Sequence, residues 1–354
     1  MTTAEHAQLT IPLPDDWHLH LREGEMMRTV LPFTSRHFGR AIVMPNLAPP
    51  VVTRADAVRY HSEITAALPA GEHFKPLMTL YLTEQTDPED VRAAFEHSDT
   101  VAVKLYPAGA TTNSAAGVHD LEKIFPVLAV MEEIGMPFLV HGEVVDADID
   151  IFDREAVFIE RKLMPIRQRF PHLKIVFEHL TTREGVAYVR SCDSHTAATI
   201  TPHHLVINRN AMLVGGIKPH YYCLPVAKRE QHRLALREAA TSGDPRFFLG
   251  TDSAPHLNQA KESACGCAGV FNVATALSIV AQVFEDEQAL SQFEGFVSRH
   301  GPAFYDMPVN DRELTLIRHD DPLPLPKKVS TSEGEITIFD PMIALHWEVV
   351  EAAG

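Results

Sequence analysis

The sequence of 354 residues has few cysteines and no long apolar run. The four cysteines, Cys192, Cys223, Cys265 and Cys267, are too few for a disulfide scaffold in a chain of this length. No apolar stretch is long enough to span a membrane, and residues 1–14 lack the basic start and apolar run of a signal peptide. We therefore expect a cytoplasmic protein with free thiols.

Positive charge is also scarce. Lysine and arginine total 31 against 47 aspartates and glutamates, which gives a formal net charge of −16. A negative field of this size repels nucleic acids and anionic membranes, so we expect neither as a partner. An anionic small-molecule substrate would need local positive charge, from metal ions or a few arginines.

The chain lacks internal repeats and the Gly-x-Gly-x-x-Gly motif of dinucleotide-binding folds. Instead, short runs rich in β-branched or aromatic residues alternate with longer amphipathic segments, which is typical of βα units around a parallel sheet. The eight strands predicted in this way cover residues 16–22, 41–44, 77–82, 101–105, 137–141, 174–178, 197–201 and 247–249. Their spacing averages about 33 residues, the size of a βαβ unit. We predict an α/β fold, a (β/α)8 TIM-type barrel in one domain spanning 1–354, with a doubly wound sheet as the alternative.

Helices are predicted between these strands. They cover residues 25–38, 53–68, 120–135, 153–170 and 273–299, and two more begin at Asp87 and near Thr181. Thr53 is a predicted N-cap, Pro88 suits a first helical turn, and Thr181 with Glu184 resembles a capping box. A proline-rich linker at 321–326 and a strand at 335–339 break the pattern, so we expect residues 321–354 to form a short C-terminal extension that packs on the barrel.

The first predicted strand contains His18, His20 and Arg22 at alternate positions. Alternate side chains of a strand share one face, so these three would lie together, whereas Trp17, Leu19 and Leu21 would share the other face. Two imidazoles on one face can bind a metal ion, and the arginine beside them can bind an anion. The alternative is an ordinary strand with two half-buried histidines.

Ligand-type residues recur at the ends of the other predicted strands. In a TIM barrel the active site lies at the carboxyl ends of the strands. The residues that would gather there are His18, His20, Arg22, Asn46, Lys104, His141, His179 and Asp252. Each of them alone could be structural, but their recurrence favours a functional site.

Lys104 lies within an apolar strand, where an unpaired ammonium is costly and its pKa should fall. A neutral lysine could react with carbon dioxide to give a carbamate, an anion able to bridge two metal ions. The alternative is an ion pair with a neighbouring acid such as Glu178, and the spacing alone favours that pair.

Four motifs together resemble the amidohydrolase superfamily and, within it, the dihydroorotases of the bacterial single-function type. They are Asp-Trp-His-Leu-His-Leu-Arg at 16–22, Met-Pro-Asn at 44–46, Val-Lys-Leu-Tyr-Pro at 103–107 and Gly-Thr-Asp-Ser-Ala-Pro-His at 250–256. The likeness covers nearly the whole chain. It implies two zinc ions, one held by His18, His20 and Asp252 and the other by His141 and His179. Carboxylated Lys104 (N6-carboxylysine) and a hydroxide would bridge the two ions, in keeping with the ligand preferences of zinc.

The resemblance also implies the reaction, the interconversion of dihydroorotate and N-carbamoyl-L-aspartate in pyrimidine biosynthesis. Asp252 would act as general base and then acid. Arg22, Asn46 and His256 would bind the substrate carboxylate, and backbone groups of Leu224 and Ala268 would contact the pyrimidine ring. A homodimer is expected on the same ground.

The segment 107–117, which follows Lys104, is small, polar and bounded by glycine. It could be a mobile loop or a lid, and the resemblance favours a lid whose Thr111 and Thr112 bind the substrate. Two alternatives remain for the whole chain: another cyclic-amide hydrolase such as a hydantoinase, or a non-catalytic amidohydrolase-like scaffold. His203, His204 and the pair Cys265 and Cys267 have no assigned role.

Overall fold

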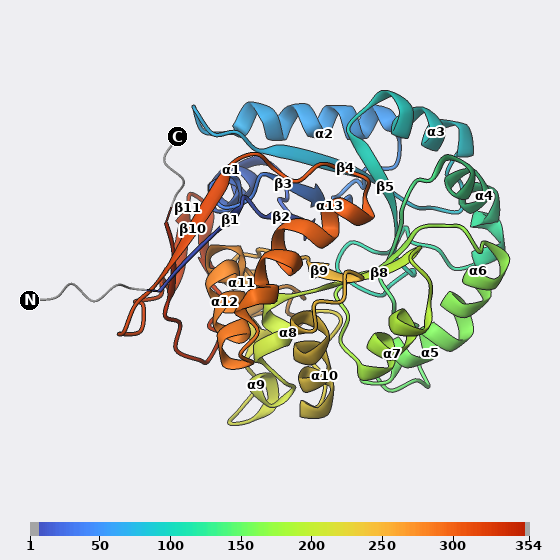
Figure 1. Cartoon of the computed structure of the whole chain (residues 1–354). Coiled ribbons are helices and arrows are strands. Elements are labelled where there is room, and N and C mark those ends of the chain that lie inside the picture. The colour runs from blue at the N-terminus through green and yellow to red at the C-terminus, as the bar shows by residue number, and fades with distance from the viewer. Residues whose placement is uncertain (1–6, 351–354) are drawn as a thin grey trace, which may run out of the picture.

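Eight parallel strands form the centre of the computed structural model, which describes residues 7–350 (Figure 1). Residues 1–6 of the segment considered for a signal peptide, and 351–354 of the predicted extension, lie outside the described residues. The strands are β2 (Asp15–Leu19), β3 (Arg40–Val43), β4 (Lys75–Tyr81), β5 (Thr100–Leu105), β6 (Phe138–Val140), β7 (Ile175–Phe177), β8 (Thr196–Ile200) and β9 (Phe247–Leu249), paired in that order. A parallel bridge between Leu19 and Ser253 joins the two edges. The predicted (β/α)8 barrel is confirmed.

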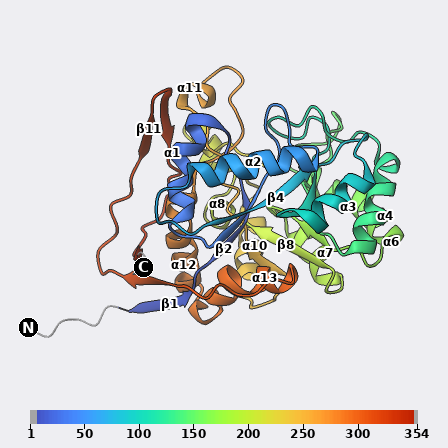
Figure 2. The ribbon, with the colours of Figure 1, turned by 90° about the horizontal axis from the view of Figure 1, so that it is seen from above.

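Helices surround the barrel (Figures 1 and 2). They are α1 (Gly24–Ser35), α2 (Arg54–Ala67), α3 (Pro88–His97), α4 (Phe125–Ile134), α5 (Arg154–Phe158), α6 (Met164–Arg169), α7 (Arg183–Ser191), α8 (Pro202–Val206), α9 (Asn210–Leu213), α10 (Glu230–Thr241), α11 (Asn258–Lys261), α12 (Ala276–Asp286) and α13 (His300–Phe304). The predicted N-cap Thr53, and Asp87 at the predicted start of the next helix, both accept a backbone N–H from their helix. These caps satisfy amides that would otherwise lack a partner.

Two helix predictions were wrong in detail. The N-cap of α7 is Thr182, not Thr181, and its hydroxyl accepts from the amide of Gly185. The Thr181 hydroxyl instead donates to the buried carboxylate of Glu155. The single helix predicted over 273–299 is divided after α12, because Gln288 adopts a left-handed φ of 57° that an α-helix cannot continue through.

Trp17 does not share a face with Leu19 and Leu21, as the alternation predicted. The register of β2 against β3 shifts between Asp16 and Leu19, so that β2 contains one more residue than its partner over this stretch. Such a bulge turns the following side chains to a different face. Trp17 therefore packs inside the barrel, stacked on Tyr305 with ring centroids 4.5 Å apart, whereas the two leucines pack in the cluster outside it.

The two ends of the described chain meet beside the barrel. β1 (Gln8–Pro12), β10 (Glu313–Arg318) and β13 (Trp347–Val350) form an antiparallel sheet, and β11 (Lys328–Thr331) pairs with β12 (Gly334–Thr337) in a hairpin. The predicted strand 335–339 overlaps β12, but β1, β10, β11 and β13 were missed. Ile336, Ile338 and Trp347 are buried in the same apolar cluster as the outer faces of the barrel strands. β11 lies next to α1 and α11 in Figure 2.

Gly301 in α13 lies directly against Trp17 on the barrel floor. A Cβ at Gly301 would be 1.9 Å from Nε1 of Trp17. Alanine is the better helix former by about 1 kcal/mol, but overpacking a core costs typically 1–3 kcal/mol. We expect Gly301→Ala to lower the free energy of unfolding by up to about 2 kcal/mol in urea denaturation. Ala303→Gly, at an exposed position of the same helix, is the propensity control, and a stabilised Gly301→Ala variant would contradict the prediction.

Candidate active site

One cavity at the carboxyl ends of the strands collects most of the predicted site residues. Its lining includes His18, His20, Arg22, Asn46, Thr111, Thr112, His141, His179, Leu224, Asp252 and Ala268, together with Tyr106, Ala254 and Gly269. Lys104 and His256 contact members of this lining without being part of it. Residues from separate units of the barrel are thus brought to one place, as expected of strand ends in this fold.

Three of these residues form a tight triangle of donor atoms. Nε2 of His18 and Nε2 of His20 are 3.3 Å apart, and Oδ1 of Asp252 is 3.3 Å from the first and 3.1 Å from the second. Ligands at the usual distances from a tetrahedral zinc ion are separated by roughly 3.4 Å. All three side chains are buried, so the geometry fits one metal ion.

His141 and His179 lie beside that triangle. The ring centroid of His179 is 4.8 Å from that of His141 and 5.0 Å from that of His18. Nδ1 of His179 is buried without a hydrogen-bond partner, an arrangement that is costly unless a cation or water binds there. His179 and Asp252 also have left-handed φ angles, 41° and 46°. Strain of this kind is concentrated at functional sites.

Lys104 forms an ion pair with Glu178, the alternative that its spacing favoured. Both side chains are fully buried, and Oε1 of Glu178 is also 3.0 Å from Nδ1 of His18. Burial lowers the pKa of Lys104, and Glu178 opposes that shift. Burial would also lower the pKa of His18, but Glu178 and Asp252 outweigh it and raise that pKa to about 9. Glu178 therefore orients His18 and neutralises Lys104.

Arg22 also lines the cavity, three residues after the end of β2, and has a left-handed φ of 64°. Its Nε donates to the carbonyl of Pro255 at 3.2 Å, and its Nη2 is 3.0 Å from Nε2 of His256. The same Nε2 is 2.9 Å from the carbonyl of Ala268. Burial, and then the charge of Arg22, lowers the pKa of His256 to about 2, so its imidazole is neutral. The guanidinium has no carboxylate partner among the described residues, which leaves its charge available to an anion.

The loop 107–117 is folded over the cavity. The carbonyl of Thr112 accepts from Nδ2 of Asn46 at 3.1 Å, and the hydroxyl of Thr112 lies 3.4 Å from the carbonyl of Ala268. Asn113 donates back to the carbonyl of Asn46 at 3.1 Å. The loop therefore connects the ends of β3 and β5 to the segment that contains Ala268.

Several residues that position this site were missed in the sequence. Asp16 accepts from the amide of Thr251 at 2.8 Å and from its hydroxyl at 2.6 Å. Oε2 of Glu143 is 3.1 Å from Nε2 of His141, and the Lys228 ammonium is 3.7 Å from the other oxygen of Glu143. The only local signal was the presence of acids two residues from the histidines. Their partners are distant in sequence, so spacing could not identify them.

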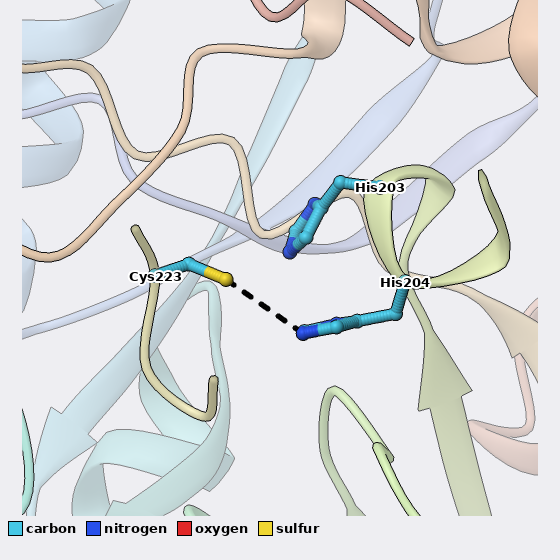
Figure 3. Close-up of side chains that lie close together, drawn as sticks. All are labelled: His203, His204 and Cys223. Carbon is cyan, nitrogen blue, oxygen red and sulfur yellow. Dashed lines mark hydrogen bonds between the residues drawn. The ribbon is translucent and has the colours of Figure 1, made fainter. Parts of the chain in front are cut away.

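His203, His204 and Cys223 also lie close together, beside the cavity (Figure 3). Nε2 of His204 faces the carbonyl of Pro225 at 3.1 Å, and the Cys223 thiol donates to the same oxygen at 3.4 Å. A carbonyl only accepts, so Nε2 of His204 carries a proton and is not free to bind a metal. This arrangement supports the backbone of 223–225. Cys265 and Cys267 are free thiols.

The comparisons with known proteins agree with this geometry. The model of the amidohydrolase family matches residues 15–307. A dihydroorotase of Ruegeria sp. is 63% identical over 341 residues, covering 96% of this chain and 99% of that protein. A dihydroorotase of Rhizobium meliloti is 61% identical over 344 residues, covering 97% of this chain and 99% of that protein. The chain belongs to the dihydroorotases of the amidohydrolase family. It is thus a hydrolase acting on a cyclic amide and not a non-catalytic scaffold.

Solved structures of dihydroorotases share the whole fold. The enzyme of Saccharomyces cerevisiae, in complex with 5-fluoroorotic acid, is 32% identical with a TM-score of 0.89, and 98% of this chain and 99% of that chain are covered. The Campylobacter jejuni dihydroorotase is 32% identical with a TM-score of 0.88, and 98% of this chain and 98% of that chain are covered. An L-hydantoinase of Arthrobacter aurescens is 15% identical, with a TM-score of 0.77 and coverage of 96% and 82%, which shows a common fold alone. No helix in residues 7–350 is long and apolar enough to cross a membrane.

Glu143 is expected to orient His141 for metal binding, because a carboxylate bound to a ligand histidine fixes its ring and tautomer. We expect Glu143→Gln to weaken zinc binding by about 10- to 100-fold, measured by competition with a chelator. Glu160→Gln, at an exposed position nearby, should leave the zinc affinity unchanged. Equal affinities for both variants would rule out this role for Glu143.

Proposed function

We propose that this dihydroorotase interconverts dihydroorotate and N-carbamoyl-L-aspartate with two zinc ions in its active site. The observation that carries the proposal is the cavity itself. It joins a triangle of metal-ligand atoms to an arginine without a carboxylate partner among the described residues. A cyclic amide bearing a carboxylate matches both parts of the cavity, with the amide at the metal-ligand atoms and the carboxylate at the arginine.

The described residues fit the metal ions. His18, His20 and Asp252 would hold one ion and His141 with His179 the other, with Lys104 between them as its carbamate. When bound, zinc ions supply a Lewis acid for a carbonyl oxygen and lower the pKa of water. The buried Nδ1 of His179 without a partner supports a cation in this place. Conversion of Lys104 to an anion would end its attraction to Glu178, which would still lie beside His18.

The substrate carboxylate is assigned to Arg22, Asn46 and His256. A buried guanidinium binds a carboxylate strongly, since charge-assisted hydrogen bonds become stronger in a site with little water. Because His256 is neutral, it has a single N–H, at Nε2, which would be shared between the carbonyl of Ala268 and the substrate carboxylate. The net negative charge of the chain does not oppose this binding, since the positive potential is local.

Asp252 is assigned the proton transfers. Burial raises its pKa, but His18 and His20 outweigh burial and hold it well below the usual value, so the carboxylate is ionised and can accept a proton. In hydrolysis it takes the proton of the attacking water and gives it to the ring nitrogen as the amide C–N bond breaks. Ring closure is the reverse of these steps.

We also propose that the reaction belongs to pyrimidine biosynthesis, as the family resemblance implies, and that the protein is cytoplasmic. The four free cysteines are consistent with a reducing compartment. The homodimer stays a prediction, which sedimentation of the purified protein would test.

The proposal is tested by metal analysis and an ultraviolet assay with dihydroorotate. We expect about two zinc ions per chain, turnover of dihydroorotate, and little turnover of hydantoin, which lacks the carboxylate. Arg22→Met should raise KM by roughly 10-fold or more, because a hydrogen bond to a charged group contributes about 1.5–3 kcal/mol. Absence of both zinc and turnover would overturn the proposal. Hydantoin turned over as fast as dihydroorotate would favour the hydantoinase alternative.

The loop 107–117 is proposed to act as a lid whose Thr111 and Thr112 donate hydrogen bonds to the substrate. Replacing both by valine removes two donors worth about 1 kcal/mol each. We expect kcat/KM to fall roughly 10-fold or more while the zinc content is unchanged. Thr65→Val, on the exposed face of α2, is the matched control. Kinetics identical to the wild type would refute the lid.

A further inference from the structure

Lys261, the last residue of α11, is a buried lysine without an acidic partner. Its side chain is 4% exposed, and within residues 7–350 no carboxylate forms an ion pair with it. Its ammonium instead donates to three backbone carbonyls, those of Tyr222 at 2.8 Å, Cys267 at 2.8 Å and Gly269 at 2.6 Å. Burying an ammonium in this way is costly unless all its donors are used, and here all three are.

The three carbonyls belong to two segments that line the active-site cavity. Tyr222 is two residues before Leu224, and Cys267 and Gly269 flank Ala268. Leu224 and Ala268 both line the cavity. The amide of Gly269 also donates to the carbonyl of Tyr222 at 3.0 Å, so the two segments are in direct contact where the ammonium binds them.

The far end of the first segment has its own support. His204 and the Cys223 thiol, whose side chains face each other in Figure 3, both donate to the carbonyl of Pro225. The carbonyl of Ala268 is likewise held, by Nε2 of His256 at 2.9 Å. Between these supports, the ammonium of Lys261 is a charged group that binds both segments.

We propose that Lys261 is a positioning residue for substrate binding, whose ammonium holds the segments of Leu224 and Ala268 at the separation that fits the pyrimidine ring. The proposal rests on the proposed function, because the ring contacts of these two residues belong to it. Lys261 does not touch the substrate. Lys261 acts by preorganising the binding site. The two segments are already in place when the substrate arrives, so binding does not have to pay for ordering them.

Lysine suits this position because an ammonium offers three donors from one small atom. A neutral amine offers only two, and a methionine of similar length offers none. Loss of the ammonium would leave buried carbonyls unpaired and let the segments separate. A displacement of about 1 Å in a binding site can cost as much as 100-fold in rate.

The test compares Lys261→Met with the wild type, both loaded with zinc. Binding of orotate, an unreactive pyrimidine with the same carboxylate, is measured by calorimetry, and KM and kcat are measured with dihydroorotate. We expect the Kd of orotate and the KM to rise by about 10- to 100-fold, with the zinc content unchanged. Lys327→Met, an exposed lysine of the C-terminal extension, should change neither quantity. A folded Lys261→Met variant with wild-type Kd and KM would overturn the proposal.

Hydrogen exchange provides a second measurement that needs no substrate. The Gly269 amide should exchange slowly in the ligand-free wild type and much faster in Lys261→Met or, if that variant does not fold, in Lys261→Gln. Rapid exchange of this amide in the wild type would show that Lys261 does not hold the two segments together before the substrate binds. The same protection in a folded variant as in the wild type would show it too. If the wild type neither binds orotate nor turns over dihydroorotate, the proposed function fails, while the exchange data still decide whether Lys261 holds the two segments.

Discussion

The join between the first and last barrel strands is the contact on which the site depends. The amide of Asp252 donates to the carbonyl of His18 at 2.8 Å, and Asp16 accepts from both the amide and the hydroxyl of Thr251. Closing the barrel therefore brings the carboxylate of Asp252 to His18 and His20, which are more than 230 residues away in sequence. Without this closure the donor triangle would be divided between two open edges of a sheet.

The closed barrel also buries charge that must be balanced within it. Glu178 lies between Lys104 and His18, and Glu143 lies between His141 and Lys228. Each acid thus contacts one histidine and one lysine, so the cost of burial is offset by two partners. These networks fix the orientation of the histidine rings before any ion binds. Left-handed backbone at His179 and Asp252 adds strain, which the surrounding packed strands sustain.

The residues proposed to select the substrate lie on a different part of the molecule from the proposed metal ligands. The ligand histidines lie on or just after the strands, whereas Arg22, Leu224, His256 and Ala268 lie on segments that follow them. Hydantoinases share the barrel at low identity. Fold likeness alone therefore does not define the substrate, and the segments around the cavity must do so. Contacts of single side chains with backbone carbonyls, as at Pro225 and Gly269, hold these segments in place.

The sequence by itself determined the eight strands and the residues at the strand ends that meet in the cavity. Both depend on local information: short runs rich in β-branched or aromatic residues, and polar residues at the point where each strand ends. Leu224 and Ala268 were expected from the family resemblance, and not from such local patterns. Only the tertiary structure decided the inward position of Trp17, the division of the helix over 273–299 and the partners of Glu143 and Lys261. A bulge depends on the neighbouring strand, and a buried charge depends on acceptors far away in sequence. Spacing along the chain cannot specify such contacts, because they exist only once the barrel has closed.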